Sequence, residues 1–369
     1  MIYFDNAATS FPKPSCVTEE TIRCLKLYCG NPGRSSHRLA MAASEKIYDT
    51  RERLAELVSV DNAENIVFTP NATYALNLCI KGTVTESCHC IISDMEHNSV
   101  IRPLKKCAEK FNCEISEFDA FLPLDKSLIP LIRNDTRVII TTIASNVIGR
   151  TLDITKLSKI AEDYNIKLII DASQYLGHMP LSLKNINFHA LCSAGHKALF
   201  GIQGSGFVIF KTSENLDTLI EGGNGLDTFS PYMPVLLPER YEAGTLSTPA
   251  IASLWAGIGF INEVGAENIH THVNRLTDKI ADILSAFQDI KIYGAENGII
   301  SFNFKDYSSH LISKHLDQYN IATRPGFHCA PTIHRKLGTD KQGAVRISLS
   351  YLNTLKECDS LYKALKAIK

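Results

Sequence analysis

The chain contains 369 residues, of which 45% are hydrophobic and 21% are charged, as in an ordinary soluble globular protein of two or three domains. Thirty-eight basic and 39 acidic residues give a net charge of −1 without a block of one sign, which argues against nucleic-acid or membrane-surface binding. The N-terminus lacks a signal-peptide pattern, and no apolar run approaches the ~18 residues of a membrane span. Eleven scattered cysteines predict a reducing compartment, the cytoplasm.

Helical and strand patterns alternate along the first two thirds of the chain. Ser15 is expected to cap the first helix. Helices are predicted at residues 15–29, 39–58, 72–81, 99–111 and 154–164. Short apolar strands are predicted at residues 65–69, 90–93, 137–142, 167–171, 188–193 and 206–210. Such strands, separated by helices, predict an α/β fold with a mostly parallel central sheet and helices on both faces.

The last third of the chain reads differently. Residues 221–244 are rich in Gly and Pro and predict a long ordered loop, followed by a long helical stretch over residues 248–287. Strands at 299–304 and 344–348 and helices at 308–319 and 354–367 then predict a smaller α+β domain. We therefore expect a large domain over residues 15–255, and a small one over residues 256–369 joined by the N-terminal segment 1–14.

Two charged residues follow predicted strands where ligands bind in open α/β sheets. Lys197 comes after a buried strand and a glycine, and a lysine held neutral there can form a Schiff base. Asp171 ends the preceding strand and could keep a pyridine nitrogen protonated. Taken singly, Lys197 could be a solvated loop lysine and Asp171 a helix N-cap. Their occurrence in consecutive βα units favours a cofactor site.

Two further segments carry potential chemistry. Asn71, Ala72 and Thr73 open a helix after a strand, which suits either a phosphate or a plain helix cap. Cys329 lies among turn-forming residues beside His328 and Arg324, which are expected to favour its thiolate, although many cysteines are inert core thiols. No metal site is expected, because Cys88-His89-Cys90 lacks a second Cys/His pair and reads as the edge of a strand.

Ordered motifs along nearly the whole chain resemble one enzyme family. They are YFDNAAT, NPGRSSH, MEHNS, ASNVIG, DASQ, SAGHK, YEAGT, RPGFHCAP and VRISLSYLNT. The chain resembles the class V aminotransferase-like enzymes of pyridoxal-phosphate (PLP) fold type I, and among them the cysteine desulfurases and selenocysteine lyases. The short loop around Cys329 is similar to that of the short-loop, or group II, desulfurases.

The resemblance implies a role for each matching residue. Lys197 would form the Schiff base with PLP and move the substrate's Cα proton, and Cys329 would accept the sulfur. The resemblance also implies cofactor contacts: Asp171 with the pyridinium nitrogen, Gln174 with the ring oxygen, and Asn146 near the ring oxygen. His97 would lie on the ring face and act in proton transfer. The phosphate would be surrounded by Ala72, Thr73, His196 and Ser193, together with Thr245 of the partner subunit. The implied substrate contacts are Arg346 on the carboxylate, Asn146 beside it and Arg34 at the entrance.

Three positions depart from the family pattern. Ala194 stands where many relatives have a phosphate-binding serine, Ala72 replaces a hydroxyl residue, and Gly33 stands where many short-loop members have histidine. The resemblance still implies conversion of L-cysteine to L-alanine with a persulfide left on Cys329. Alternatives are a selenocysteine lyase, another class V PLP-dependent lyase or aminotransferase, and a non-catalytic sulfur carrier.

The resemblance also implies partners. A homodimer is expected, because fold type I sites are completed across a dimer interface, together with a sulfur-acceptor protein. Iron–sulfur cluster assembly, tRNA thiolation and thio-cofactor synthesis are all open as destinations for the sulfur.

Overall fold

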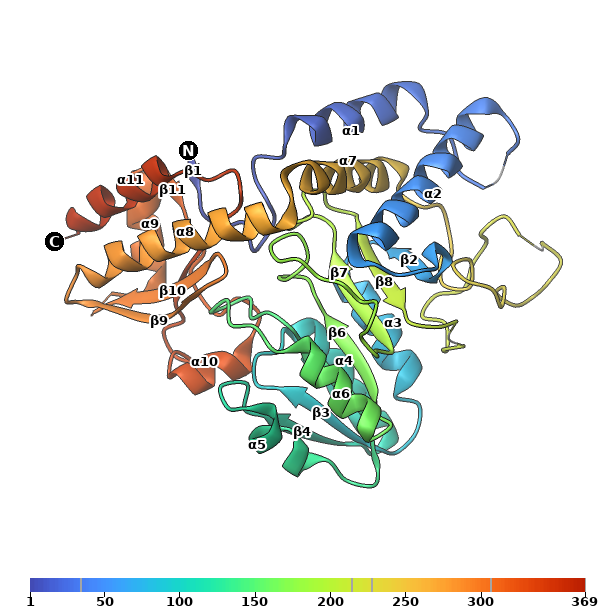
Figure 1. Ribbon diagram of the computed structural model, residues 1–369, viewed down its shortest axis with the longest axis horizontal. Coiled ribbons are helices and arrows are strands. Elements are labelled where there is room, and N and C mark those ends of the chain that lie inside the picture. The colour runs from blue at the N-terminus through green and yellow to red at the C-terminus, as the bar shows by residue number, and fades with distance from the viewer. Residues whose placement is uncertain (34, 214, 227, 306, 369) are drawn as a thin grey trace.

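A seven-stranded sheet forms the centre of the large part of the molecule (Figure 1). The computed structural model describes residues 1–33, 35–213, 215–226, 228–305 and 307–368. In sheet order, the strands are β2 (Ile66–Thr69), β8 (Gly206–Phe210), β7 (Ala190–Ala194), β6 (Lys167–Asp171), β5 (Thr136–Thr142), β3 (His89–Ser93) and β4 (Glu114–Phe118). Strands β7, β6, β5, β3 and β4 run parallel, and β8 is antiparallel to both of its neighbours.

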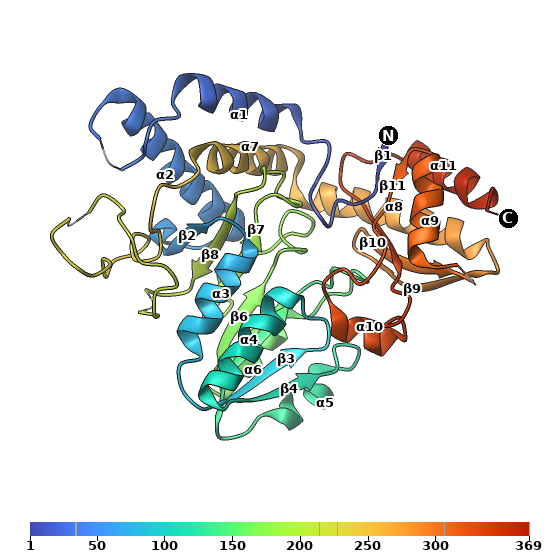
Figure 2. The same ribbon diagram turned by 180° about the vertical axis from the view of Figure 1, so that it is seen from behind.

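Helices cover both faces of this sheet, because alternate strand residues are apolar on each side. In β5, Val138 and Ile140 pack beneath α3 (Ala72–Thr83) and α4 (Asn98–Phe111), which lie side by side in Figure 2. Ile139 belongs to the core of the opposite face. That face is covered by α2 (Arg38–Val58), α6 (Ile154–Asp163) and α7 (Thr248–Val264), with α1 (Ser15–Leu27) packed on α7 and the short α5 (Leu124–Ser127) near β4.

A three-stranded antiparallel sheet forms the second part of the molecule. Its order is β12 (Val345–Ser348), β10 (Ile299–Phe304) and β9 (Ile290–Glu296). The helices of this part are α8 (Ala266–Ser285), α9 (Ser309–Gln318), α10 (Pro331–Leu337) and α11 (Leu355–Lys366). The N-terminal strand β1 (Ile2–Tyr3) pairs in parallel with β11 (Ile321–Ala322), so both ends of the chain belong to this region.

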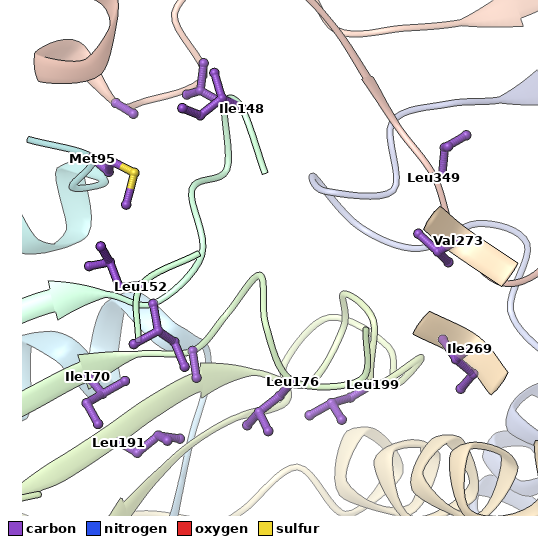
Figure 3. Close-up of a cluster of buried hydrophobic side chains, with 14 of the residues drawn as sticks. Met95, Ile148, Leu152, Ile170, Leu176, Leu191, Leu199, Ile269, Val273 and Leu349 are labelled. Atoms are coloured by element: carbon purple, nitrogen blue, oxygen red, sulfur yellow. The ribbon is translucent and has the colours of Figure 1, made fainter. Parts of the chain in front are cut away.

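One continuous apolar core joins the two parts. Figure 3 follows it from Ile170 and Leu191 on the large sheet to Val273 on α8 and Leu349 after β12. This shared core fixes the two parts of the molecule on either side of the cavity that forms the candidate site. Among the described residues, no helix is long and apolar enough to cross a membrane.

The predicted fold class is confirmed, with instructive differences in detail. The strands predicted at 167–171 and 206–210 match β6 and β8. The helical stretch predicted over 248–287 is confirmed, and it is divided into α7 and α8 at Gly265, which adopts φ +88°. Ser15 is the first helical residue and not the cap, a position that Pro14 occupies. The domain division at residue 255 stays a prediction, and it falls within α7.

Candidate active site

The carboxyl ends of the parallel strands open onto a polar cavity of about 200 Å³. Most of the residues singled out from the sequence line it. They are Ala72, Thr73, His97, Asn146, Asp171, Gln174, His196, Lys197 and Arg346. They come from turns that follow five different strands and from β12, so only the folded sheet brings them together.

Lys197 faces this cavity from the turn after β7. Its ammonium is costly to keep charged there, so burial lowers the pKa of Lys197 to about 8. Asp171 opposes this shift by favouring the charged form, and the nearby guanidinium of Arg346 adds to it. At pH 7 roughly a tenth of this amine is then neutral, far more than for an ordinary lysine of pKa about 10.5, which makes it a competent nucleophile for a carbonyl.

Asp171 is the last residue of β6 and is buried beside Lys197. Its Oδ1 accepts a hydrogen bond from the Ser173 backbone N–H at 2.9 Å. The carboxylate therefore closes a turn instead of capping a helix, since no helix lies between β6 and β7 in this fully described stretch. A buried, oriented carboxylate is suited to pairing with a cationic ring nitrogen.

His97 precedes α4 and has a defined tautomer. Its Nδ1 accepts the Ser99 backbone N–H at 3.0 Å, so the single proton of the neutral ring resides on Nε2. Burial lowers the pKa of His97 to about 4, which keeps the ring neutral. The Ser99 hydroxyl also contacts Nδ1 at 2.9 Å and the Thr73 hydroxyl at 2.8 Å, linking the starts of α3 and α4.

Glu96, the residue before His97, is a buried acid that the sequence did not single out. It is fully buried, hydrogen-bonds the Ser93 hydroxyl, and accepts the Thr142 backbone N–H at 2.9 Å. Burial raises the pKa of Glu96 to about 8. The carboxyl group thus ties the turn after β3 to the end of β5. The signal that could have found it is an acidic residue directly before His97, in the turn between an apolar strand and a helix.

The start of α3 provides the best anion site in the cavity. Asn71 caps the helix by accepting the Tyr74 N–H at 3.1 Å, and Ala72 and Thr73 line the cavity at the first turn. His196 lines the opposite side, and its buried Nδ1 has no hydrogen-bond partner among the described residues. A helix start and an unpaired ring nitrogen together suit a phosphate group.

Arg346 is almost fully buried at the small-domain side of the cavity, with 1% of its surface exposed. Nη2 pairs with Asp5 at 2.8 Å and Nη1 donates to the Asn146 carbonyl at 3.0 Å. Nε has no partner within the described chain. This leaves a buried donor beside the cavity that a carboxylate ligand could satisfy. Gln174 is anchored nearby through the Ala7 carbonyl, 3.0 Å from Nε2.

Cys329 lies in a loop with an unusual backbone. His328 and Cys329 are consecutive left-handed residues, with φ of 49° and 57°, a conformation that is costly outside glycine. The loop is held by two 2.7 Å hydrogen bonds, from the Asn98 N–H to the Cys329 carbonyl and from Asn146 Nδ2 to the His328 carbonyl. The thiol is solvent-exposed. Cys329 is therefore presented by the loop and not packed as a core thiol.

A relay of three buried side chains fixes the loop from behind. His328 Nε2 donates to the Arg324 carbonyl at 3.1 Å, so its Nδ1 accepts from His334 Nε2 at 3.2 Å. His334 Nδ1 in turn accepts from the Thr339 hydroxyl at 2.7 Å. Burial lowers the pKa of His328 to about 2 and that of His334 to about 4. The neutral His328 ring places no positive charge beside Cys329.

The polar run His334-Arg335-Lys336 reads as an exposed segment, which fits Arg335 and Lys336 but not His334. It lies in α10, where His334 is fully buried and Lys336 forms ion pairs with Asp94 and Asp119. This helix of seven residues is too short for the spacing of its apolar residues to stand out in the sequence.

Three of the predicted site residues that the structure describes lie outside the cavity. Cys329 lines a groove that adjoins it and shares Thr73, His97 and Ser99 with it. Ser193 follows Cys192 in β7 and points to the opposite face of the sheet, while Ala194 lines the cavity. Thr245 lines a separate cavity with Glu242 and is not brought to the site within one chain. Arg34 lies outside the described residues.

Known proteins are similar to this chain in both sequence and fold. The family model described as aminotransferase class-V matches residues 2–361. A protein named probable cysteine desulfurase from Methanothermobacter thermautotrophicus is 29% identical over 379 residues, covering 100% of this chain and 94% of that protein. A cysteine desulfurase from Haloferax volcanii is 26% identical over 386 residues, covering 100% of this chain and 89% of its own.

A solved structure agrees with these relatives. The apo structure of cysteine desulfurase from Thermococcus onnurineus superposes with a TM-score of 0.91 at 28% identity, covering 99% of this chain and 94% of that one. The resemblance inferred from the motifs is thus confirmed at the family level, and the chain belongs to the aminotransferase class-V family.

Proposed function

We propose that this protein is a PLP-dependent cysteine desulfurase, which converts L-cysteine to L-alanine and leaves the sulfur on Cys329 as a persulfide. The observation that carries the proposal is the arrangement of one amine and one thiol. Lys197 faces the buried cavity, and Cys329 lies in the groove that adjoins it. The full-length desulfurase relatives support the same reaction.

The residues around the cavity fit PLP. Lys197 supplies an amine of lowered pKa, Asp171 a buried carboxylate, and the start of α3 an anion site. The unpaired His196 Nδ1 and Arg346 Nε are buried polar atoms that phosphate and carboxylate oxygens would satisfy. When bound, PLP would supply an electron sink for negative charge at the substrate Cα, with Asp171 keeping its ring nitrogen protonated.

Residues of the chain itself would bind the substrate, move its Cα proton and accept its sulfur. Arg346 would bind the substrate carboxylate, and Lys197, as the free amine, would remove the Cα proton. His97 would cover one face of the bound ring and offer its Nε2 proton. The Cys329 thiolate would attack the substrate sulfur, so that the substrate C–S bond breaks and an S–S bond forms on Cys329. L-Cysteine and one enzyme thiol thus become L-alanine and one enzyme persulfide, with no external oxidant.

A homodimer would complete the site. The loop between Glu221 and Gly244 exposes large apolar side chains, with 99% of Phe229, 82% of Tyr232 and 74% of Leu236 accessible. Exposed apolar clusters of this kind are typical of protein interfaces. Thr245 follows this loop, which supports a phosphate contact from Thr245 of the partner subunit. Sedimentation or sizing of the active protein should therefore give a dimer, and a strictly monomeric active species would contradict this part of the proposal.

The sulfur would be transferred to an acceptor protein, and the reaction would take place in a reducing cytoplasm. All eleven cysteines are free thiols, which supports that compartment. An exposed Cys329 is accessible to a second thiol. Iron–sulfur cluster assembly is one destination that this chemistry would serve.

The decisive assay uses the PLP-loaded protein with L-cysteine and dithiothreitol, and measures alanine and sulfide. We expect both products from the wild type and from Cys29→Ala, a matched exposed cysteine. Cys329→Ala should retain the cofactor absorbance and lose both products. Normal alanine formation by Cys329→Ala would refute the desulfurase proposal, and far faster turnover of L-selenocysteine would reassign the enzyme as a selenocysteine lyase.

A further inference from the structure

The groove that holds Cys329 is built mainly from α3 and α4. It encloses about 460 Å³ and is lined by Asn77 and Lys81 on α3 and by Arg102 and Lys106 on α4. Because it adjoins the cofactor cavity through Thr73, His97 and Ser99, anything bound in it lies beside the Cys329 sulfur.

This groove carries positive charge that no ion pair among the described residues balances. Lys81, Arg102 and Lys106 are all exposed, and none forms an ion pair with the residues that the structure describes. Arg102 and Lys106 lie one turn apart on α4, so they present their charges on one side of the helix. No carboxylate is found among the described residues that line the groove. For a chain with a net charge of −1, three unbalanced cations beside one thiol are a local exception.

We propose that this groove docks an acidic segment of the sulfur-accepting protein and steers the acceptor thiol to Cys329. The inference rests on the proposed function. The acceptor thiolate attacks the outer sulfur of the Cys329 persulfide, the S–S bond to Cys329 breaks, and Cys329 leaves as a thiolate. The transferred sulfur stays bonded to the acceptor as its own persulfide, so no oxidant or reductant is consumed.

Charge and size favour an acidic protein segment over a nucleic acid. Nucleic-acid sites extend as basic stripes with aromatic side chains for base stacking, whereas this groove contains three cations and the chain is nearly neutral. Complementary charge around a reactive centre raises association rates by about 10- to 1,000-fold at low salt, and salt removes the gain. The groove therefore predicts salt-sensitive selectivity between acceptors.

The test measures single-turnover sulfur transfer from enzyme preloaded with persulfide. The probes are two synthetic peptides with one cysteine each, flanked by glutamates in one and by lysines in the other, together with dithiothreitol as an uncharged thiol. Each peptide's intrinsic reactivity is normalised against a small disulfide, because flanking carboxylates make a thiolate harder to form. We expect the acidic peptide to react at least about tenfold faster at low salt, with the preference lost at high salt.

Two double variants on the same helix make the test specific. Arg102→Glu with Lys106→Glu reverses charge inside the groove, and Lys105→Glu with Lys110→Glu makes the same change on exposed α4 residues that do not line it. The first pair should invert the peptide preference, the second should keep it, and both should transfer sulfur to dithiothreitol at the wild-type rate.

The outcomes separate this inference from the proposed function. No transfer to dithiothreitol by the wild type would mean that the desulfurase proposal has failed. Normal transfer to dithiothreitol without an acidic preference, or with an equal response of the two double variants, would overturn the docking proposal. A short RNA that blocks transfer to the peptides while a glutamate-rich peptide without cysteine does not would also overturn it, and would assign the groove to nucleic acid.

Discussion

The cofactor cavity and the Cys329 loop adjoin each other but differ in their exposure to water. In the cavity, Lys197, Asp171 and Arg346 are drawn from distant parts of the chain and kept away from water, which lowers the pKa of Lys197 and orients the charges. In the loop, one thiol is exposed on a strained backbone, and the ordering groups His328 and His334 are buried behind it. Carbanion chemistry gains from exclusion of water, whereas sulfur delivery needs a second molecule to reach the atom.

This comparison predicts which variants should share a phenotype. Changes in the cavity should alter the cofactor's absorbance, its binding or the folding of the large sheet. Changes in the relay behind the loop should spare the cofactor and slow sulfur transfer.

The largest effect is expected for Lys197→Ala in the cavity. Loss of the amine removes the covalent link to PLP and the proton transfer at Cα, the latter alone worth about 100- to 10,000-fold in rate. Absorbance spectra should lose the band of the lysine-linked cofactor, and alanine formation should fall by at least this factor. Lys167→Ala, on an exposed lysine of β6, is the control and should keep both. An unchanged spectrum for Lys197→Ala would remove Lys197 from the site.

A smaller effect is expected at Glu96, as a pH dependence of stability. Burial raises its pKa from the ordinary 4.5 to about 8 in the folded protein. The folded state then keeps a proton that the unfolded chain loses, so the stabilising contribution present below about pH 4.5 is lost as pH rises through about 8. Relative to Glu96→Gln, the wild-type apoprotein should lose about 3–5 kcal/mol of unfolding free energy across this window.

Urea unfolding at a series of pH values checks this difference. The exposed Glu64, substituted by Gln, serves as the control and should follow the wild type. Parallel pH profiles for wild type and Glu96→Gln would show that the Glu96 carboxyl titrates normally and that its burial has no energetic consequence.

The smallest effect is expected at His334 in the relay. His334→Ala leaves His328 Nδ1 unpaired in a buried site, which costs about 1–3 kcal/mol and loosens the left-handed backbone at Cys329. Sulfur transfer to dithiothreitol should slow by about 5- to 100-fold, which is that free energy expressed as a rate, while cofactor absorbance and the KM for L-cysteine stay near wild type. His315→Ala, which also removes a histidine hydrogen bond, should leave transfer unchanged. Equal transfer rates for the two variants would limit the relay to a structural role.

The sequence predicted what depends on short, local patterns. Apolar runs predicted β6 and β8, and motifs at strand ends singled out Lys197, Asp171 and His97, which line one cavity. Strand β4 escaped prediction because it is an edge strand in which only Ile115 and Phe118 are apolar, without regular alternation, and β9 because most of its residues are only partly buried.

Other features depend on contacts that no local pattern carries. His334 reads as part of a polar run, yet it is buried because α10 packs against the loop that carries Cys329. The break between α7 and α8 required the positive φ of Gly265, and an interior glycine alone does not predict a break. Ala194 and not Ser193 lines the cavity, because neighbouring residues of a strand point to opposite faces of the sheet.

The central claim is that Cys329 receives the sulfur that the cavity releases. The most direct measurement is peptide mass spectrometry of the PLP-loaded protein after a single addition of L-cysteine without reductant, followed by alkylation. The account predicts one added sulfur atom on the peptide that contains Cys329, in proportion to the alanine formed. Alanine in full amount with the sulfur on another cysteine, or released as elemental sulfur without labelling Cys329, would contradict it.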